Sequence, residues 1–110
     1  MKDRVTGMLG LCARAGRLIT GEKAVIQAIR AGNCFLAVLD GDAAENARDS
    51  LGRACRTHGV PMITISAAEL GKAIGRPGRM AAGVTDAGMA KRLIEMDAML
   101  EAKSFDRPDD

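Results

Sequence analysis

Aromatic residues are nearly absent from this chain of 110 residues. Phe35 and Phe105 are the only two, and the sequence contains no tryptophan and no tyrosine. A hydrophobic core must therefore be built from leucine, isoleucine, valine, methionine and alanine. A nucleic-acid-binding protein of this composition cannot rely on rows of aromatic side chains that stack on bases, which argues against an RRM and against a single-strand stacking platform.

Histidine and cysteine are scarce as well. The single histidine, His58, has no second histidine with which to form a metal site or a catalytic group, and we expect it near the end of a helix. Cys12, Cys34 and Cys55 lie far apart among apolar residues, so we expect buried free thiols in a reducing cytoplasm. No apolar run is long enough to cross a membrane, and the N-terminus does not resemble a secretion signal.

The sequence also lacks the motifs of nucleotide chemistry. Gly16 and Gly21 have the spacing of a Walker-A loop, but glutamate and lysine follow where the motif requires lysine and then serine or threonine. No GxGxxG segment follows a predicted strand. Asp40 and Asp42 could hold a metal ion, but turn formation and helix capping already explain them. We therefore expect no cofactor, no metal and no catalytic activity.

Charge is present in both signs, but it is unevenly distributed. The net charge is +2, and from Glu95 onward the chain holds six acidic and two basic residues. The preceding part holds 14 basic and 8 acidic residues. A basic body with a mildly acidic tail suits a polyanionic partner, although an ordinary solvated surface could carry the same charges.

Hydrophobic periodicity predicts strict alternation of helices and strands in a single domain, residues 1–102, followed by a flexible acidic tail, residues 103–110. Such alternation implies a central sheet with helices on both faces. The predicted helices cover about residues 3–15, 21–32, 42–58, 66–74 and 85–102, and the predicted strands cover residues 18–20, 35–39, 60–65 and 80–84.

Polar residues that can cap a helix precede four of these helices. We expect Thr20 to cap the second helix, and Asp42 and Ser66 to cap the third and fourth, each with a glutamate three residues later as in a capping box. Thr85 or Asp86 caps the last helix. Glycines are expected to end the first three, at Gly16, Gly32 and Gly59.

Three loops are expected to meet at one edge of the sheet, because helix N-termini and strand C-termini gather there in α/β folds. They are the loops at residues 21–23, 40–42 and 76–79. The first supplies backbone N–H groups, a helix dipole and the ammonium group of Lys23, a combination that suits a phosphate. Lys23, Gln27 and Arg30 share one exposed face of the second helix and can reach a common partner.

The residues at these positions resemble a known family. The segments that carry the resemblance are Leu9-Gly10-Leu11-Cys12-Ala13-Arg14-Ala15-Gly16-Arg17-Leu18, the 21–32 helix, Val60-Pro61 and Glu69-Leu70-Gly71-Lys72-Ala73-Ile74-Gly75. They are similar to the kink-turn-binding ribosomal proteins of the large-subunit seven-Ae and thirty-e types, and within these to a bacterial YlxQ-like branch. The resemblance implies a three-layer α/β/α sandwich with a mixed sheet of about four strands, which binds structured RNA, commonly a kink-turn, and has no catalytic activity.

Carried over by position, the family's Gly-x-Asn-Glu segment falls on residues 21–24. Gly21 matches, Lys23 replaces asparagine, and Ala24 stands where the family has the glutamate or glutamine that reads a sheared guanine. Gln27 replaces a lysine. The family's RNA-facing loop before the last strand falls on residues 76–80 and is more basic here. Phosphate contact is thus supported, whereas the base preference stays open.

We therefore predict a monomeric cytoplasmic protein that binds structured RNA of the ribosome or of transcription. Its predicted protein partners are ribosomal or transcription-associated proteins. The alternative is a protein-interaction scaffold that kept the fold and lost specific RNA binding. The residues that we expect to contact RNA are Arg17, Gly21, Glu22, Lys23, Gln27, Arg30, Asp40, Asp42, Arg76, Arg79 and Met80.

Overall fold

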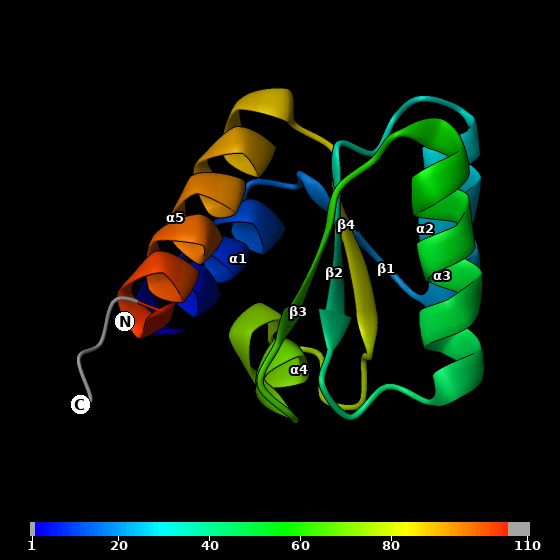
Figure 1. The fold of residues 1–110 in the computed structure, drawn as a ribbon. Helices are drawn as coiled ribbons and strands as arrows, with labels where there is room; N and C mark the ends of the chain where they lie inside the picture. The colour runs from blue at the N-terminus through cyan, green and yellow to red at the C-terminus, as the bar shows by residue number, and fades with distance from the viewer. Residues whose placement is uncertain (1, 106–110) are drawn as a thin grey trace.

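The computed structural model describes residues 2–105, and helices and strands alternate along this whole range as predicted (Figure 1). Residues 103–105, predicted as the start of the tail, belong to the last helix, which ends at Phe105. The rest of the predicted tail, residues 106–110, lies outside the described residues. The elements are α1 (Lys2–Arg14), β1 (Leu18–Thr20), α2 (Glu22–Arg30), β2 (Leu36–Asp40), α3 (Glu45–His58), β3 (Met62–Ile65), α4 (Glu69–Ile74), β4 (Ala81–Val84) and α5 (Ala87–Phe105).

The four strands of the described chain form one mixed sheet in the order β1-β4-β2-β3. Strands β2 and β3 are parallel, and β4 runs antiparallel to both β1 and β2. Val38 is paired with Ile63 on one side and with Ala82 on the other, so β2 lies inside the sheet. This arrangement confirms the predicted mixed sheet.

The helices cover both faces of the sheet, which gives three layers (Figure 1). Helices α1, α4 and α5 pack against one face, where Leu36 and Val38 of β2 point. Helices α2 and α3 pack against the other, where Ala37 and Leu39 point. Because successive side chains of a strand face opposite sides, a strand buried on both faces must be apolar throughout, as β2 is up to Leu39.

Some of the predicted helix ends are confirmed. The Asp86 carboxylate accepts a hydrogen bond of 2.9 Å from the N–H of Met89 and caps α5. Gly16 follows α1 with φ +72°, and the N–H of Arg17 donates to the carbonyl of Cys12 at 2.9 Å, which closes the helix. The left-handed Gly59 ends α3 in the same way.

Three predicted caps are wrong. Gly21 is the N-cap residue of α2, Ala44 that of α3 and Ala68 that of α4, and none of the three helices has a side-chain cap of its own. Thr20 instead ends strand β1. The turn after β2 is longer than predicted, so Asp42 lies three residues before Glu45, the first residue of α3.

The start of α4 is held by a residue distant in the sequence, Asp40. Its buried carboxylate, which is 0% exposed, accepts hydrogen bonds from the N–H groups of Asp42 at 2.8 Å, Ala68 at 2.9 Å and Leu70 at 3.0 Å. Ala68 is the one non-glycine residue with positive φ (66°) in residues 2–105, a strained conformation that these bonds hold in place. Asp40 thus replaces the local cap that Ser66 was expected to provide.

The environment of Asp40 keeps its carboxylate charged. Burial by itself would raise its pKa, but the N–H donors of Asp42, Leu70 and Ala68 outweigh that effect and lower the pKa below the ordinary value. A side chain with no exposed surface and both oxygens bonded to backbone cannot contact RNA. The prediction of Asp40 as an RNA ligand is therefore wrong, because the carboxylate is used inside the fold.

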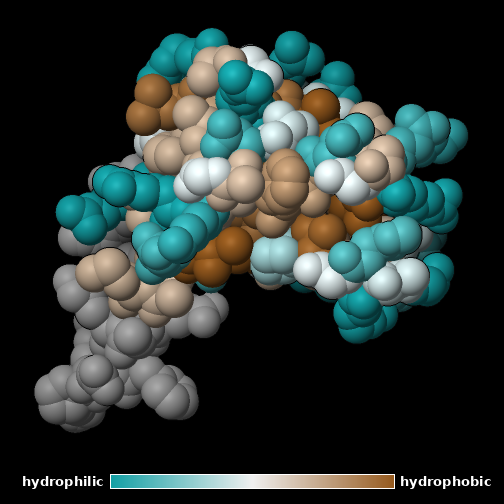
Figure 2. All heavy atoms as spheres, turned by 90° about the horizontal axis from the view of Figure 1, so that it is seen from above, coloured by the Kyte–Doolittle hydropathy of each residue, from teal (hydrophilic) through white to brown (hydrophobic). Residues whose placement is uncertain are grey.

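Apolar side chains also reach the surface. Among the described residues, the exposed large ones are Leu11, Phe35 and Met99. Figure 2 views the molecule from the end where β2 begins and shows hydrophobic side chains exposed among hydrophilic ones. None of the described helices combines the length and the apolar character needed to span a membrane.

Substitution of Asp40 tests this link. Asp40→Asn replaces one acceptor oxygen by an NH2 donor that faces backbone N–H groups, so we expect a loss of about 2–3 kcal/mol in the free energy of unfolding. Urea unfolding at pH 7 measures this loss. Asp42→Asn is the matched control, because the Asp42 side chain is exposed and only its backbone N–H takes part.

The same pair of variants predicts a pH dependence. Because the pKa of Asp40 is lower in the folded protein, its stabilisation is complete above the ordinary carboxyl pKa of about 4 and is lost as pH falls through the folded-state value. The stability difference between wild type and Asp40→Asn should therefore shrink as the pH is lowered from 6 to 2. A constant difference over this range would contradict the assignment.

Candidate functional site

The predicted loops do meet at one edge of the sheet. The N–H of Gly21 donates to the carbonyl of Ala81 at 3.0 Å, and the N–H of Asp40 donates to the carbonyl of Met80 at 2.8 Å. The loop before β4 is therefore held between the ends of β1 and β2. Because β4 is antiparallel to both neighbours, its beginning lies beside their ends.

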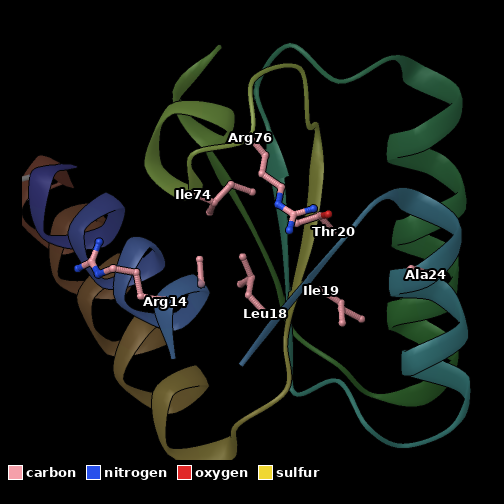
Figure 3. A pocket seen from close by; sticks show the side chains of 8 residues that line it. Arg14, Leu18, Ile19, Thr20, Ala24, Ile74 and Arg76 are labelled. Atoms are coloured by element: carbon pink, nitrogen blue, oxygen red, sulfur yellow. The ribbon is translucent and has the colours of Figure 1, made fainter. Parts of the chain in front are cut away.

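A surface hollow of about 430 Å³ lies over β1, between α1 and α2 (Figure 3). Leu18, Ile19 and Ile74 supply apolar walls to this hollow, which we call the β1 hollow. Arg76 descends from the loop before β4, and its guanidinium lies beside Thr20 (Figure 3). The hollow thus combines an apolar surface with hydrogen-bond donors.

Strand β1 is an edge strand. It pairs only with β4 within the described sheet, so its outer edge carries backbone polar groups without a strand partner. Leu18, Ile19 and Thr20 are half-buried. A ligand in the β1 hollow can therefore meet backbone N–H and C=O groups as well as side chains.

Basic residues lie on the segments that adjoin this edge: the end of α1, the start of α2 and the loop before β4. Arg14, Arg17, Lys23, Arg76 and Arg79 are all exposed, and none forms an ion pair with an acidic side chain of the described part of the chain. Because no carboxylate of the described residues neutralises them, these five cations produce a positive potential that attracts anions. The arrangement suits a ligand with several negative charges.

Gly21 is where the backbone and the basic loop come closest. Its φ of +98° is one that side chains rarely adopt, and a Cβ there would lie 3.5 Å from Nη1 of Arg79. Arg79 therefore lies over the start of α2. The guanidinium, the first N–H groups of the helix and the helix dipole all favour an anion at this point.

Helix α2 presents the predicted basic stripe. Lys23, Gln27 and Arg30 are exposed, whereas Val25 and Ile29 are buried against the sheet. The stripe runs from the β1 hollow to the opposite end of the helix, a rise of about 10 Å at 1.5 Å per residue.

The loop of residues 76–79 is shaped by Gly71 of α4. A Cβ at Gly71 would lie 2.9 Å from the carbonyl oxygen of Arg76 and 3.1 Å from both Cα of Pro77 and N of Gly78. All three atoms belong to the backbone, so the loop could not yield by a side-chain rotation. Close approach to α4 therefore sets where Arg76 and Arg79 lie.

The predicted site residues divide into groups. Arg17, Lys23, Gln27, Arg30, Asp42, Arg76 and Arg79 are exposed, and Gly21, Glu22 and Met80 are partly buried. Their contact with RNA stays a prediction. Of these predicted residues, only Asp40 is fully buried, so it is not part of the site.

Sequence reasoning missed part of the β1 hollow. Arg14, Thr20 and Ile74 line it, but Thr20 was predicted only as a helix cap, and neither Arg14 nor Ile74 was predicted as a site residue. Arg14 could have been considered, because it ends a helix that leads directly into β1. Ile74 could not, since its place depends on packing between α1 and α4.

The model of the Ribosomal protein L7Ae/L30e/S12e/Gadd45 family matches residues 3–94. The chain belongs to this family. Its L7Ae-type fold and its resemblance to YlxQ proteins are thereby confirmed. The chain is 37% identical over 90 residues to the RNA-binding protein YlxQ of Bacillus subtilis (strain 168). The aligned region covers 81% of this chain and 90% of that protein. It is 33% identical over 96 residues to the RNA-binding protein YlxQ of Enterococcus faecium, with 86% and 92% covered.

Solved structures of this L7Ae-type fold agree with the architecture. A protein of unknown function from Bacillus halodurans superposes with a TM-score of 0.82 at 34% identity, covering 84% of this chain and 95% of that one. The Giardia lamblia 15.5kD RNA binding protein superposes with a TM-score of 0.70 at 19% identity, covering 88% and 84%, and shows the fold alone. The family is named after ribosomal proteins and Gadd45, and both named relatives are RNA-binding proteins, in agreement with the prediction of a non-enzymatic protein.

The role of Gly71 in this L7Ae-type domain can be tested without a ligand. Gly71→Ala should displace residues 75–80 and lower the free energy of unfolding by about 1–3 kcal/mol, because the added methyl group meets backbone atoms. Gly7→Ala in α1 is the control: nothing lies within 4 Å of its Cβ position, so alanine should stabilise the helix by about 0.5–1 kcal/mol. Unchanged amide chemical shifts for residues 75–80 in Gly71→Ala would contradict the assignment.

Proposed function

We propose that this protein binds structured RNA without catalysis, and that the β1 hollow with its surrounding basic side chains is the binding site. The observation that carries the proposal is an apolar hollow on an open sheet edge with the Arg76 guanidinium in it and Arg79 over the adjoining start of α2. Both arginines are exposed and form no ion pair within the described part of the chain. The names of the YlxQ relatives as RNA-binding proteins support the choice of RNA as the polyanion.

The two kinds of surface correspond to the two parts of a nucleotide. Phosphates would be bound by Lys23, Arg79 and the first N–H groups of α2, since charge and the helix dipole act together there. An unstacked base can enter the β1 hollow and lie against Leu18 and Ile19, with the Arg76 guanidinium as a flat donor group. Duplex RNA offers phosphates only, whereas a loop or an internal bulge offers both.

The finer proposal is a kink-turn or a similar internal loop in RNA linked to the ribosome or to transcription, bound by a monomer in the cytoplasm. The position of Ala24 bears on it, because Ala24 lines the β1 hollow and is exposed. A side chain placed there points toward a bound base. Alanine has no hydrogen-bonding group, so shape and phosphate contacts would supply most of the recognition.

Loss of single cations should weaken RNA binding through electrostatics. We expect Lys23→Ala and Arg79→Ala each to weaken binding to kink-turn, loop and duplex RNAs and to reduce the slope of log K against log salt by about 1, as for one lost phosphate contact. Arg53→Ala is the control, because Arg53 is exposed on α3 and does not line the hollow. Fluorescence anisotropy at several salt concentrations measures both quantities.

Two outcomes would contradict the proposal. If the wild-type protein binds none of the three RNAs with a Kd below about 1 mM at low salt, it is not an RNA-binding protein of the proposed kind. The fold would then serve as a protein-interaction scaffold. If Arg53→Ala reduces affinity and slope as much as Lys23→Ala does, the attraction is non-specific and the β1 hollow is not the site.

A second variant tests base recognition. Ala24→Glu places a carboxylate at the rim of the hollow, where it can accept hydrogen bonds from a base edge, as the family's acidic residue is expected to do. We expect kink-turn RNA to be favoured over duplex RNA by a further factor of about 5–100, equivalent to one bidentate base contact. Ala24→Gln is the control for charge, and an unchanged preference in both would contradict the positional match.

A further inference from the structure

The end of the molecule opposite the 76–79 loop carries a second hollow, of about 300 Å³. It lies where α2 and α3 end and β2 and β3 begin, and we call it the Phe35 hollow. Ile29, Val60 and Pro61 contribute apolar surface, and Phe35 is 41% exposed beside them. Figure 2 looks onto this end, where hydrophobic side chains lie open to solvent between hydrophilic ones.

The backbone that carries the Phe35 ring is held in place. The N–H of Phe35 donates to the carbonyl of Val84 at 2.9 Å, which fixes its backbone to the sheet. The adjoining loop is also anchored, since the N–H of Asn33 donates to the carbonyl of Ala28 at 2.8 Å. An aromatic ring on a rigid support can offer a flat face with little loss of conformational entropy.

Basic groups border the ring. Arg30 and His58 line the same hollow, both are exposed, and neither side chain has an ion-pair or hydrogen-bond partner among the described residues. None of the described residues that line the hollow is acidic. An apolar surface with an exposed ring, bordered by a guanidinium and an imidazole, matches a nucleobase followed by its phosphate.

We propose that the Phe35 hollow binds one unpaired nucleotide of a single-stranded extension of the RNA held at the β1 hollow. The base stacks on Phe35, and its phosphate contacts Arg30 and His58. This proposal rests on the proposed RNA function. It adds a contact at the other end of α2, outside the loop edge to which the sequence motifs point.

Continuity with the first site favours RNA over a protein partner here. Lys23 and Gln27 form one exposed line with Arg30 along α2, so cationic and polar groups connect the two hollows. A strand leaving the β1 hollow can therefore follow the exposed Lys23, Gln27 and Arg30 along α2. A protein partner would need no such connection.

The test compares one RNA stem-loop with and without a single-stranded extension of about eight nucleotides, within the range that single-strand sites occupy. Phe35→Leu removes the ring and keeps an apolar side chain, and should weaken binding of the extended RNA by about 5- to 50-fold, the loss of one stacked base. Binding of the RNA without the extension should not change. Phe35→Trp should retain the affinity for the extended RNA, since tryptophan also stacks.

Met99→Leu is the matched control, because Met99 is an exposed apolar residue on α5 and should affect neither RNA. An extended RNA with 5-iodouridine in the extension should cross-link to the peptide that contains Phe35. If the wild type binds both RNAs equally and Phe35→Leu changes neither, the second contact does not exist and the proposed function stands. If Phe35→Leu weakens binding of both RNAs equally, the second contact at the Phe35 hollow is also overturned. If the wild type binds neither RNA, the proposed function itself is overturned.

Discussion

The rest of the structure depends on the buried carboxylate of Asp40. It joins the end of β2 to the start of α4 through N–H groups 28 and 30 residues away in the sequence. Helix α4 in turn carries Gly71, against which the 76–79 loop packs, and that loop leads into β4. One ionised side chain inside the fold therefore sets the position of the arginines on its surface. An apolar residue in its place would leave several buried N–H groups without an acceptor.

Small residues replace aromatic ones in bringing the layers together. A Cβ at Gly83 of β4 would lie 2.9 Å from Sγ of Cys34, 3.2 Å from Cγ1 of Val25 and 3.3 Å from Cγ1 of Ile19. Only glycine lets these side chains approach the sheet so closely. Helix α2 can then lie near β1, and its exposed face comes beside the β1 hollow. The scarcity of aromatic side chains is thus compatible with a tightly packed core of aliphatic and sulfur-containing residues.

The two hollows place complementary chemistry at the two ends of α2. At one end the groups are backbone donors, arginines and an open sheet edge, which suit phosphates and a base held by shape. At the other end a single aromatic ring lies beside two basic side chains. The absence of aromatic rows excludes an extended stacking platform, but it does not exclude one stacked base. Phe35 can therefore stack on a single base, although the chain has too few aromatic residues for an extended platform.

The sequence by itself determined the order of helices and strands, the coverage of β2 on both faces and the family. Periods of 3.6 and 2 are local properties, and motifs such as residues 9–18 and 69–75 are contiguous, so both can be recognised without a structure. The gathering of residues 21–23 and 76–79 at one edge followed from the alternation alone. The sequence also indicated which face of α2 is exposed.

Only the tertiary structure decided what Asp40 does, where the β1 hollow lies and which residues complete it. Asp42 and Ser66 had the sequence pattern of helix caps. The N–H groups at the start of α4 instead donate to the carboxylate of Asp40, the last residue of β2. Arg14 and Ile74 both line the hollow because α1 packs against α4. These features depend on contacts between residues far apart in the chain, and a local pattern carries no information about which distant group satisfies a buried N–H or fills the space beside an edge strand.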